Sequence, residues 1–167
     1  MIRPDEPRFI RQDCSGGFII VKEERLYEPE EDIVETGLTK LYLLIKRRSD
    51  LDHDAFHAAV SEYGQLLLDQ PALRKALRKF VISHRLRDPL PEGMAFAYID
   101  AVAEFWFDHP NGIARFFSSS EYASRVGPRE ASVFDAAGLR ALAAKMHVVH
   151  DEFSFQPSTM QPIPFKW

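Results

Sequence analysis

The stretch that decides the fold reads Asp100-Ala101-Val102-Ala103-Glu104-Phe105-Trp106-Phe107-Asp108. In a β-strand, side chains point alternately to the two faces of the sheet. One face would carry Ala101, Ala103, Phe105 and Phe107, and the other would carry Val102, Glu104 and Trp106. Both faces are largely apolar, so we predict a buried strand that is covered on both sides. Glu104 is the one acid inside this stretch, and its presence needs an explanation.

The composition limits the class of protein. Of the 167 residues, 46% are hydrophobic and 28% are charged, which is typical of an ordinary globular domain with a proper core. The net charge is −4 and no basic block occurs, so we expect no nucleic-acid partner. We expect no membrane partner and a cytoplasmic location, because no apolar run has membrane-spanning length and Cys14 cannot form an internal disulfide.

The chain before the opening stretch divides into an arm and the start of a core. We interpret residues 1–37 as an N-terminal extension with a short strand near 18–27. Asp52 can cap the helix that follows the first core strand. The predicted elements are a strand at 38–46, a helix at 53–69, a helical turn at 72–77, a strand at 77–86 and a strand from 96 to 107.

The chain after the opening stretch is predicted to be helical at first. Pro110 suits the first turn of a helix, and a short helical piece at 121–126 is expected to end at Gly127-Pro128. Alanines and leucines favour a helix at 136–145, and a last strand is expected at 146–153. The tail, 154–167, is apolar enough that we expect it to lie on a neighbouring surface.

The predicted order over residues 38–153 is β-α-β-β-α-β, the ferredoxin-like unit of the α+β class. Its two crossover helices would cover one face of the sheet. The other face is too apolar for bulk water, so a partner must cover it. We therefore predict a symmetric homodimer that packs through its sheet faces.

Residues 38–153 resemble the EthD family of small dimeric α+β barrel proteins. The resemblance lies in Lys40–Arg47, in Val81-Ile82-Ser83-His84 and in the opening stretch, which is similar to the family's DGxAExWFD strand. As in the family, this strand is followed by a helix and by Ser119-Ser120-Glu121-Tyr122. The resemblance implies a dimeric α+β barrel with a cavity between sheet and helices.

The resemblance also implies a class of ligand. The family's founding member accompanies an ether-degrading oxidative system, and some relatives act as decarboxylases, dehydratases or cyclases on polyketide-like aromatics. We therefore expect a small apolar or aromatic ligand within each protomer and no cofactor. The residues that we place around this cavity are Tyr42, Val60, Tyr63, Gly64, Trp106 and His150.

The chain departs from the family on its first helix. Many relatives carry Trp there and, four residues on, His. Counted from Phe56, these positions are Val60 and Gly64 in this chain. The helical histidine that could serve as an acid or base is absent.

Glu104 and His84 are the candidate acid–base pair, because they lie on different strands of one sheet and could face the same cavity. A carboxylate among aromatic rings has a raised pKa, and a nearby imidazole can exchange protons with it. The alternative is that Glu104 makes a structural salt bridge or binds backbone N–H groups.

Other polar side chains give weaker indications. His53 and His57 have the spacing of a helical zinc motif, but Asp54 stands where that motif needs Glu and no third ligand is evident, so we expect no metal. Four arginines follow strand ends and could draw an anionic ligand to a cavity mouth or form an ordinary charged rim: Arg47, Arg48, Arg85 and Arg87.

Two functions remain open on the sequence alone. The first is an enzyme or auxiliary protein in which Glu104 and His84 transfer protons next to a small apolar ligand. The second is a non-catalytic dimeric binding module whose family site has decayed. The missing helical histidine and the long ends, 1–37 and 154–167, favour the second.

Overall fold

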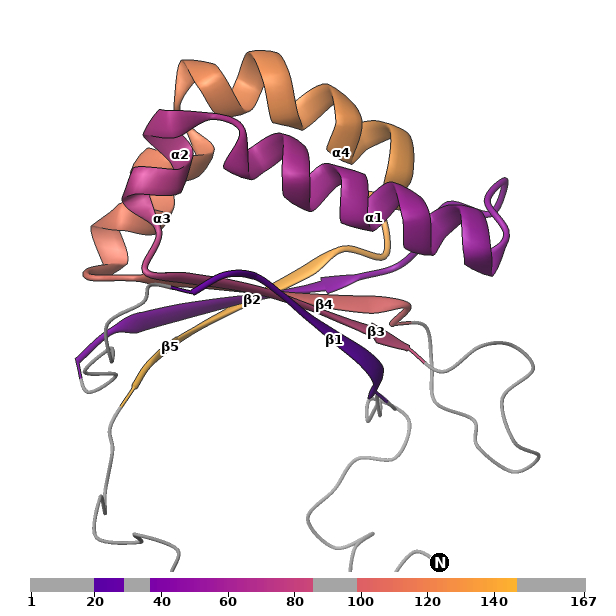
Figure 1. Ribbon diagram of the computed structural model, residues 1–167, viewed down its shortest axis with the longest axis horizontal. Coiled ribbons are helices and arrows are strands. Elements are labelled where there is room, and N and C mark those ends of the chain that lie inside the picture. The colour runs from indigo at the N-terminus through magenta and orange to yellow at the C-terminus, as the bar shows by residue number, and fades with distance from the viewer. Residues whose placement is uncertain (1–19, 29–36, 86–98, 147–167) are drawn as a thin grey trace, which may run out of the picture.

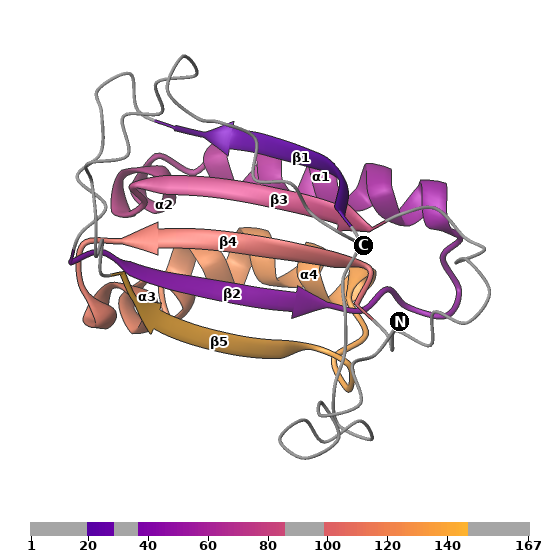
Figure 2. The same cartoon turned by 90° about the horizontal axis from the view of Figure 1, so that it is seen from below.

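The computed structural model describes residues 20–28, 37–85 and 99–146, and within them five strands form one antiparallel sheet (Figure 1). The strand order is β1-β3-β4-β2-β5, as Figure 2 shows from below. The elements, in chain order, are β1 (Ile20–Tyr27), β2 (Thr39–Ile45), α1 (His53–Leu68), α2 (Pro71–Ala76), β3 (Lys79–Arg85), β4 (Ala101–Phe107), α3 (Pro110–Phe117), the π-helical turn η2 (Tyr122–Val126), α4 (Gly127–Val133) and β5 (Arg140–Lys145).

Strands β2 to β5, with the helices between them, form the predicted β-α-β-β-α-β unit, so the ferredoxin-like α+β fold is confirmed. The opening stretch becomes β4, which lies at the centre of the sheet between β3 and β2. Strand β1, from the N-terminal extension, pairs antiparallel with β3 and adds one edge. The described helices all lie on one face of the sheet (Figure 1).

The core fills the space between the sheet and this helical layer. Phe105 of β4 is opposite Leu41 of β2 and Phe80 of β3, and the rings of Phe80 and Phe105 stack with centroids 4.6 Å apart. Helix α1 is capped as predicted, because the Asp52 side chain accepts a hydrogen bond from the Ala55 N–H at 2.8 Å. The apolar stripe of this helix is buried and consists of Phe56, Val60, Tyr63 and Leu67.

Two predicted elements after β4 are wrong. Gly127-Pro128 does not end the helical segment, because α4 begins there and holds Pro128 in its first turn, where a missing N–H costs nothing. The expected helix at 136–145 is largely an edge strand, β5, which pairs with β2 from Arg140 to Lys145. Pairing with β2 overrides the helix propensity of its alanines.

Several predictions lie outside the described residues. These are the thiol of Cys14, Arg87, His150, the tail 154–167 and all but the first residue of the strand expected at 146–153. Among the described helices, none has the length and apolar character needed to cross a bilayer.

Candidate functional site

The predicted pair Glu104 and His84 does not share a cavity. In the β3–β4 register, His84 is opposite Ala101 and Glu104 is opposite Val81. Side chains alternate along a strand, so His84 points with Phe80 and Ile82 toward the helices, while Glu104 points to the other face. The expectation that these two residues face one cavity is therefore wrong.

Glu104 lies on the side of the sheet away from the helices, which we call the open face. Its carboxylate forms an ion pair with Lys40 Nζ at 2.6 Å. Burial by itself lowers the pKa of Lys40, but its interactions with Glu104 and Tyr42 together outweigh burial, and the net shift is upward. The structural salt bridge that the sequence left as the alternative is thus present.

Lys40 also organises the aromatic side chains of the open face. Its Nζ lies 4.3 Å from the ring centroid of Trp106 and 4.6 Å from that of Tyr42, both within cation–π range. Trp106 is only 4% exposed, and its indole N–H has no hydrogen-bond partner in the described structure. A buried donor without an acceptor costs free energy, so binding of a further partner that supplies an acceptor is favoured on this face.

His84 has a different acid partner, Glu24 of β1. His84 is 1% exposed, and its Nε2 lies 3.2 Å from Glu24 Oε2. The same carboxylate oxygen accepts a hydrogen bond from Ser61 Oγ of α1 at 2.7 Å, and the other carboxylate oxygen pairs with Lys22 Nζ. The ring of His57, also on α1, stacks on His84 with centroids 3.7 Å apart. We call these five residues the His84 cluster.

The electrostatics of this cluster define the protonation of each member. Burial raises the pKa of Glu24, but hydrogen bonds from Lys22, Ser61 and His84 outweigh it and bring the pKa from 4.5 down to about 2. Burial, with the neighbouring His57, lowers the pKa of His84 below 6.5. At neutral pH an ionised Glu24 accepts the Nε2–H of a neutral His84, so Nδ1 carries the lone pair. Nδ1 is buried and has no hydrogen-bond partner in the described structure.

The cluster makes stability depend on pH. The pKa values of His57 and His84 are both lowered, chiefly by burial, so the folded chain binds fewer protons than the unfolded chain below about pH 6.5 and stability falls from there. The contribution of Glu24, about 2 kcal/mol once solvent screening of this partly exposed carboxylate is included, is present above pH 4.5 and is lost as the pH falls toward 2. Urea unfolding from pH 7 to pH 3 should show both losses. His84→Asn should reduce the loss of stability below pH 6.5, and Glu24→Gln should reduce the loss below pH 4.5. If neither variant changes the dependence of stability on pH, these residues are not its source.

The helix positions predicted to line a ligand cavity are instead tightly packed. Val60 and Tyr63 are fully buried in the core. A Cβ atom added at Gly64 would overlap Leu26 Cδ1 and would lie 3.1 Å from Ile82 Cδ1. The position at which relatives carry a histidine is therefore filled by side chains of β1 and β3. The structure leaves no room for a ligand there.

The substitution Gly64→His tests this packing. Because an imidazole would have to displace Leu26 and Ile82, we expect it to lower the free energy of unfolding by about 2 kcal/mol. The matched control is Ala58→His at an exposed position of the same helix, which should change stability by less than about 0.5 kcal/mol. Equal stability of the two variants would mean that the site has space for the ring.

Tyr63 takes part in a buried hydrogen-bond chain and does not line a cavity. Its hydroxyl lies 3.1 Å from the Tyr122 hydroxyl of η2, which donates in turn to Glu130 of α4. Burial raises the pKa of Tyr63, with the charge of Glu130 adding to the effect. This chain ties α1 to η2 and α4.

The other residues predicted to line the ligand cavity do not lie on the same side of the sheet as Val60, Tyr63 and Gly64, where the structure describes them. Tyr42 and Trp106 lie on the open face, and His150 is outside the described residues. A pocket of about 420 Å³ lies instead at the start of α3 and is lined by Ala76, Phe107, Asp108, His109, Asn111, Gly112 and Arg115. Of the predicted site residues that the structure describes, none is among those lining this pocket.

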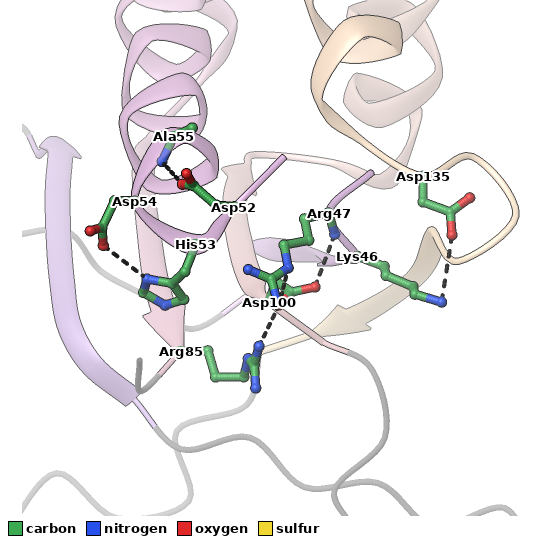
Figure 3. Close-up of polar contacts among 9 residues, drawn as sticks. All are labelled: Lys46, Arg47, Asp52, His53, Asp54, Ala55, Arg85, Asp100 and Asp135. Carbon is green, nitrogen blue, oxygen red and sulfur yellow. Dashed lines mark hydrogen bonds and ion pairs between the residues drawn. The ribbon is translucent and has the colours of Figure 1, made fainter. Parts of the chain in front are cut away.

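Two of the arginines after strand ends converge on Asp100, as Figure 3 shows. Arg85 Nη2 lies 2.7 Å from Asp100 Oδ1, and the backbone N–H of Arg47 donates to Oδ2 at 3.0 Å. Arg48 pairs with the exposed Asp50. Asp100 therefore joins the ends of β2, β3 and β4. This favours the charged-rim interpretation for Arg47 and Arg85.

The predicted histidine pair of α1 shows no metal geometry. His53 Nδ1 lies 3.4 Å from Asp54 Oδ1 (Figure 3), and His57 stacks on His84. Within residues 20–28, 37–85 and 99–146, no group of three or more His, Cys, Asp or Glu side chains is arranged to hold a metal ion.

Comparison with known proteins gives one sequence match. The family model described as the EthD domain matches residues 48–137, more than half of the chain. A search of curated protein sequences found no match.

Solved structures with a similar fold come from several organisms. A dimeric protein of unknown function and ferredoxin-like fold from Bacteroides fragilis NCTC 9343 is 14% identical, with a TM-score of 0.51 over 66% of this chain and 98% of that one. A dimeric ferredoxin-like protein of unknown function from Thermobifida fusca is 15% identical, with a TM-score of 0.49 over 71% and 100%. An ethyl tert-butyl ether degradation (EthD) family protein from Bacillus halodurans C-125 is 14% identical, with a TM-score of 0.46 over 66% and 99%. At this level of identity, the first of these supports the shared fold.

Proposed function

The chain belongs to the EthD domain family, and from this premise we propose that it is a homodimeric protein that binds a small apolar or aromatic ligand and transfers protons at the His84 cluster. The observation that carries this proposal is the buried His84, whose Nε2–H is held by an ionised Glu24 and whose Nδ1 has no partner in the described structure. A buried polar atom without a partner is often functional.

The cluster has the parts of a general base. Glu24 fixes the tautomer of His84 and leaves the Nδ1 lone pair free to accept a proton. Once His84 is protonated, the negative charge of Glu24 stabilises the imidazolium, and Ser61 and Lys22 keep Glu24 ionised. Nδ1 is closed to solvent, so a ligand must displace a neighbouring side chain to reach it.

The dimer is supported by the apolar character of the open face, and the Bacteroides fragilis relative is described as dimeric. Val81, Val102 and Trp106 lie on this face, and the described helices all lie on the opposite face (Figure 1). Packing two such sheets face to face would join these apolar residues in a symmetric interface. The expected mass in solution is twice that of one chain.

Proton transfer can be tested without knowing the natural substrate. We suggest measuring hydrogen–deuterium exchange at the carbon acid of β-keto esters and acylated phenols by NMR, with the intact protein. His84→Asn and Glu24→Gln should each slow the exchange at least tenfold. The matched control Glu23→Gln, at the exposed neighbouring position of β1, should not. Equal exchange rates in all four proteins would overturn the proposal.

A second function, a non-catalytic dimeric binding module, is favoured by one observation. The helix position that carries the histidine in relatives is Gly64, and it is filled by packed side chains. In that case, ligands would bind without any exchange, and the variants of His84 would bind as the parent does.

A further inference from the structure

The open face carries a line of cations and one aromatic ring at one end of the sheet. Lys40, Trp106 and Lys79 are opposite one another on β2, β4 and β3. Lys40 Nζ lies 4.3 Å and Lys79 Nζ lies 5.6 Å from the Trp106 ring centroid. The indole N–H of Trp106 is buried and has no partner in the described structure. This end of the face therefore offers an unused donor beside two cations.

Strand β5 ends beside this line. Met146, the last described residue, donates its N–H to the Leu38 carbonyl at 2.8 Å and accepts from the Gly37 N–H at 3.0 Å. It is thus held at the start of β2, the end at which Lys40 and Trp106 lie. Figure 2 shows that β5 ends beside the start of β2. Neighbouring strands are about 4.8 Å apart, so Trp106, two strands in from β5, is roughly 10 Å from this edge. Three or four extended residues span that distance.

The segment that follows has the chemistry to occupy this face. Residues 154–167, which lie outside the described residues, contain Phe155, Pro157, Pro162, Ile163, Pro164, Phe165 and Trp167. Prolines favour an extended polyproline conformation with free carbonyl groups, and such segments dock on aromatic residues. A tail carbonyl can accept from the Trp106 indole, and the tail's rings can stack on Lys40 and Lys79.

We propose that residues 154–167 bind across Trp106 and Tyr42 on the open face of the monomer and compete there with a second copy of the chain. The competition rests on the homodimer of the proposed function. A tethered segment acts at an effective concentration on the order of millimolar, so even a weak intrinsic affinity occupies the face. Because both protomers must release their tails, the tail should weaken dimerisation by about tenfold.

The test compares the full chain with a chain that ends at residue 153. Sedimentation over a dilution series should show a dimer dissociation constant about tenfold lower for the shortened chain. A full-length chain with Phe155, Ile163, Phe165 and Trp167 replaced by serine is the matched control, and it should dimerise as tightly as the shortened chain.

Direct binding can be read from Trp106, because the chain holds two tryptophans and the shortened form keeps only this one. A peptide of residues 154–167 with Trp167→Phe should shift the Trp106 emission and its indole N–H resonance in a saturable way. Trp106→Phe keeps an aromatic ring at this position and removes the indole N–H donor. With the unmodified peptide as the fluorescent probe, it should weaken binding about fivefold.

The outcomes separate this inference from the proposed function. If the peptide leaves the Trp106 signals unchanged and truncation leaves the dimer constant unchanged, the tail does not bind this face and the inference is overturned. If no form of the chain dimerises but the peptide still binds at Trp106, tail docking is supported and the homodimer fails. If Trp106 responds to self-association alone, the second copy is the sole occupant and the inference is overturned.

Discussion

Replacing Phe105 by alanine is expected to lower the free energy of unfolding by about 4 kcal/mol. Phe105 is 0% exposed at the centre of β4. Its ring stacks on Phe80 at 4.6 Å and meets the edges of Phe116 at 5.8 Å and Phe117 at 5.6 Å. Truncation would remove contacts with β3 and α3 at once and would leave a cavity that the sheet cannot close.

Urea unfolding followed by circular dichroism gives the change in stability. A loss of this size approaches the whole stability of a small domain, and Phe105→Ala could therefore fail to fold. Phe105→Leu, with an expected cost of about 1 kcal/mol, remains folded and can still be measured. Leu142→Ala is the matched control, because Leu142 is an apolar strand residue that is 58% exposed. It should cost less than about 0.5 kcal/mol. Similar costs for Phe105→Ala and Leu142→Ala would mean that β4 does not organise the core.

The fold could be predicted because its strands and longest helix carry strong local patterns. The alternation in Ala101–Phe107 and the apolar stripe of α1 each require one element type and one buried face. The strand over Arg140–Lys145 carries no such pattern. Its alanines are largely exposed, so hydrogen bonding to β2, and not side-chain burial, determines its conformation. The local sequence pattern of residues 140–145 does not indicate that they pair with β2.

The candidate site was harder to predict because it depends on strand register. His84 shares one face of β3 with Phe80 and Ile82, and Glu104 shares one face of β4 with Val102 and Trp106, so the residues on each face could be predicted from each strand alone. Which face of β3 and which face of β4 lie on the same side of the sheet follows only from the pairing of the two strands. Glu24, the true partner of His84, comes from β1 in the N-terminal extension, and no signal in that extension indicates that it pairs with β3.

The two faces of β4 explain why its acid is not next to the histidine. The helix face is filled by aromatic rings, and the polar cluster of His84 lies at one edge of it, where β1 and α1 meet. The open face instead pairs Glu104 with Lys40 beside Trp106. A charge in an interface is tolerated when it is paired, so this ion pair suits a face that a partner covers.

Replacing Asp100 by alanine is expected to lower the free energy of unfolding by about 3 kcal/mol. Asp100 is 7% exposed and receives charge-assisted hydrogen bonds from the Arg85 side chain at 2.7 Å and from the Arg47 N–H at 3.0 Å. Its backbone N–H donates to the Ile45 carbonyl, and its carbonyl accepts from the Arg85 N–H. Its side chain is therefore placed where three strand ends meet. Removing the carboxylate takes away the charge on which Arg47 and Arg85 converge in this buried position.

The other end of the same strand supplies the matched control. Asp108 forms a two-point ion pair with Arg78 at 2.7 and 2.8 Å, but both side chains are largely exposed. Asp108→Ala should therefore cost less than about 1 kcal/mol. Asp100→Asn keeps an acceptor for the Arg47 N–H and loses the charge, so its cost in urea unfolding should fall between the two. If Asp100→Ala cost no more than Asp108→Ala, burial would not be what distinguishes the two carboxylates, and Asp100 would not hold the strand ends together.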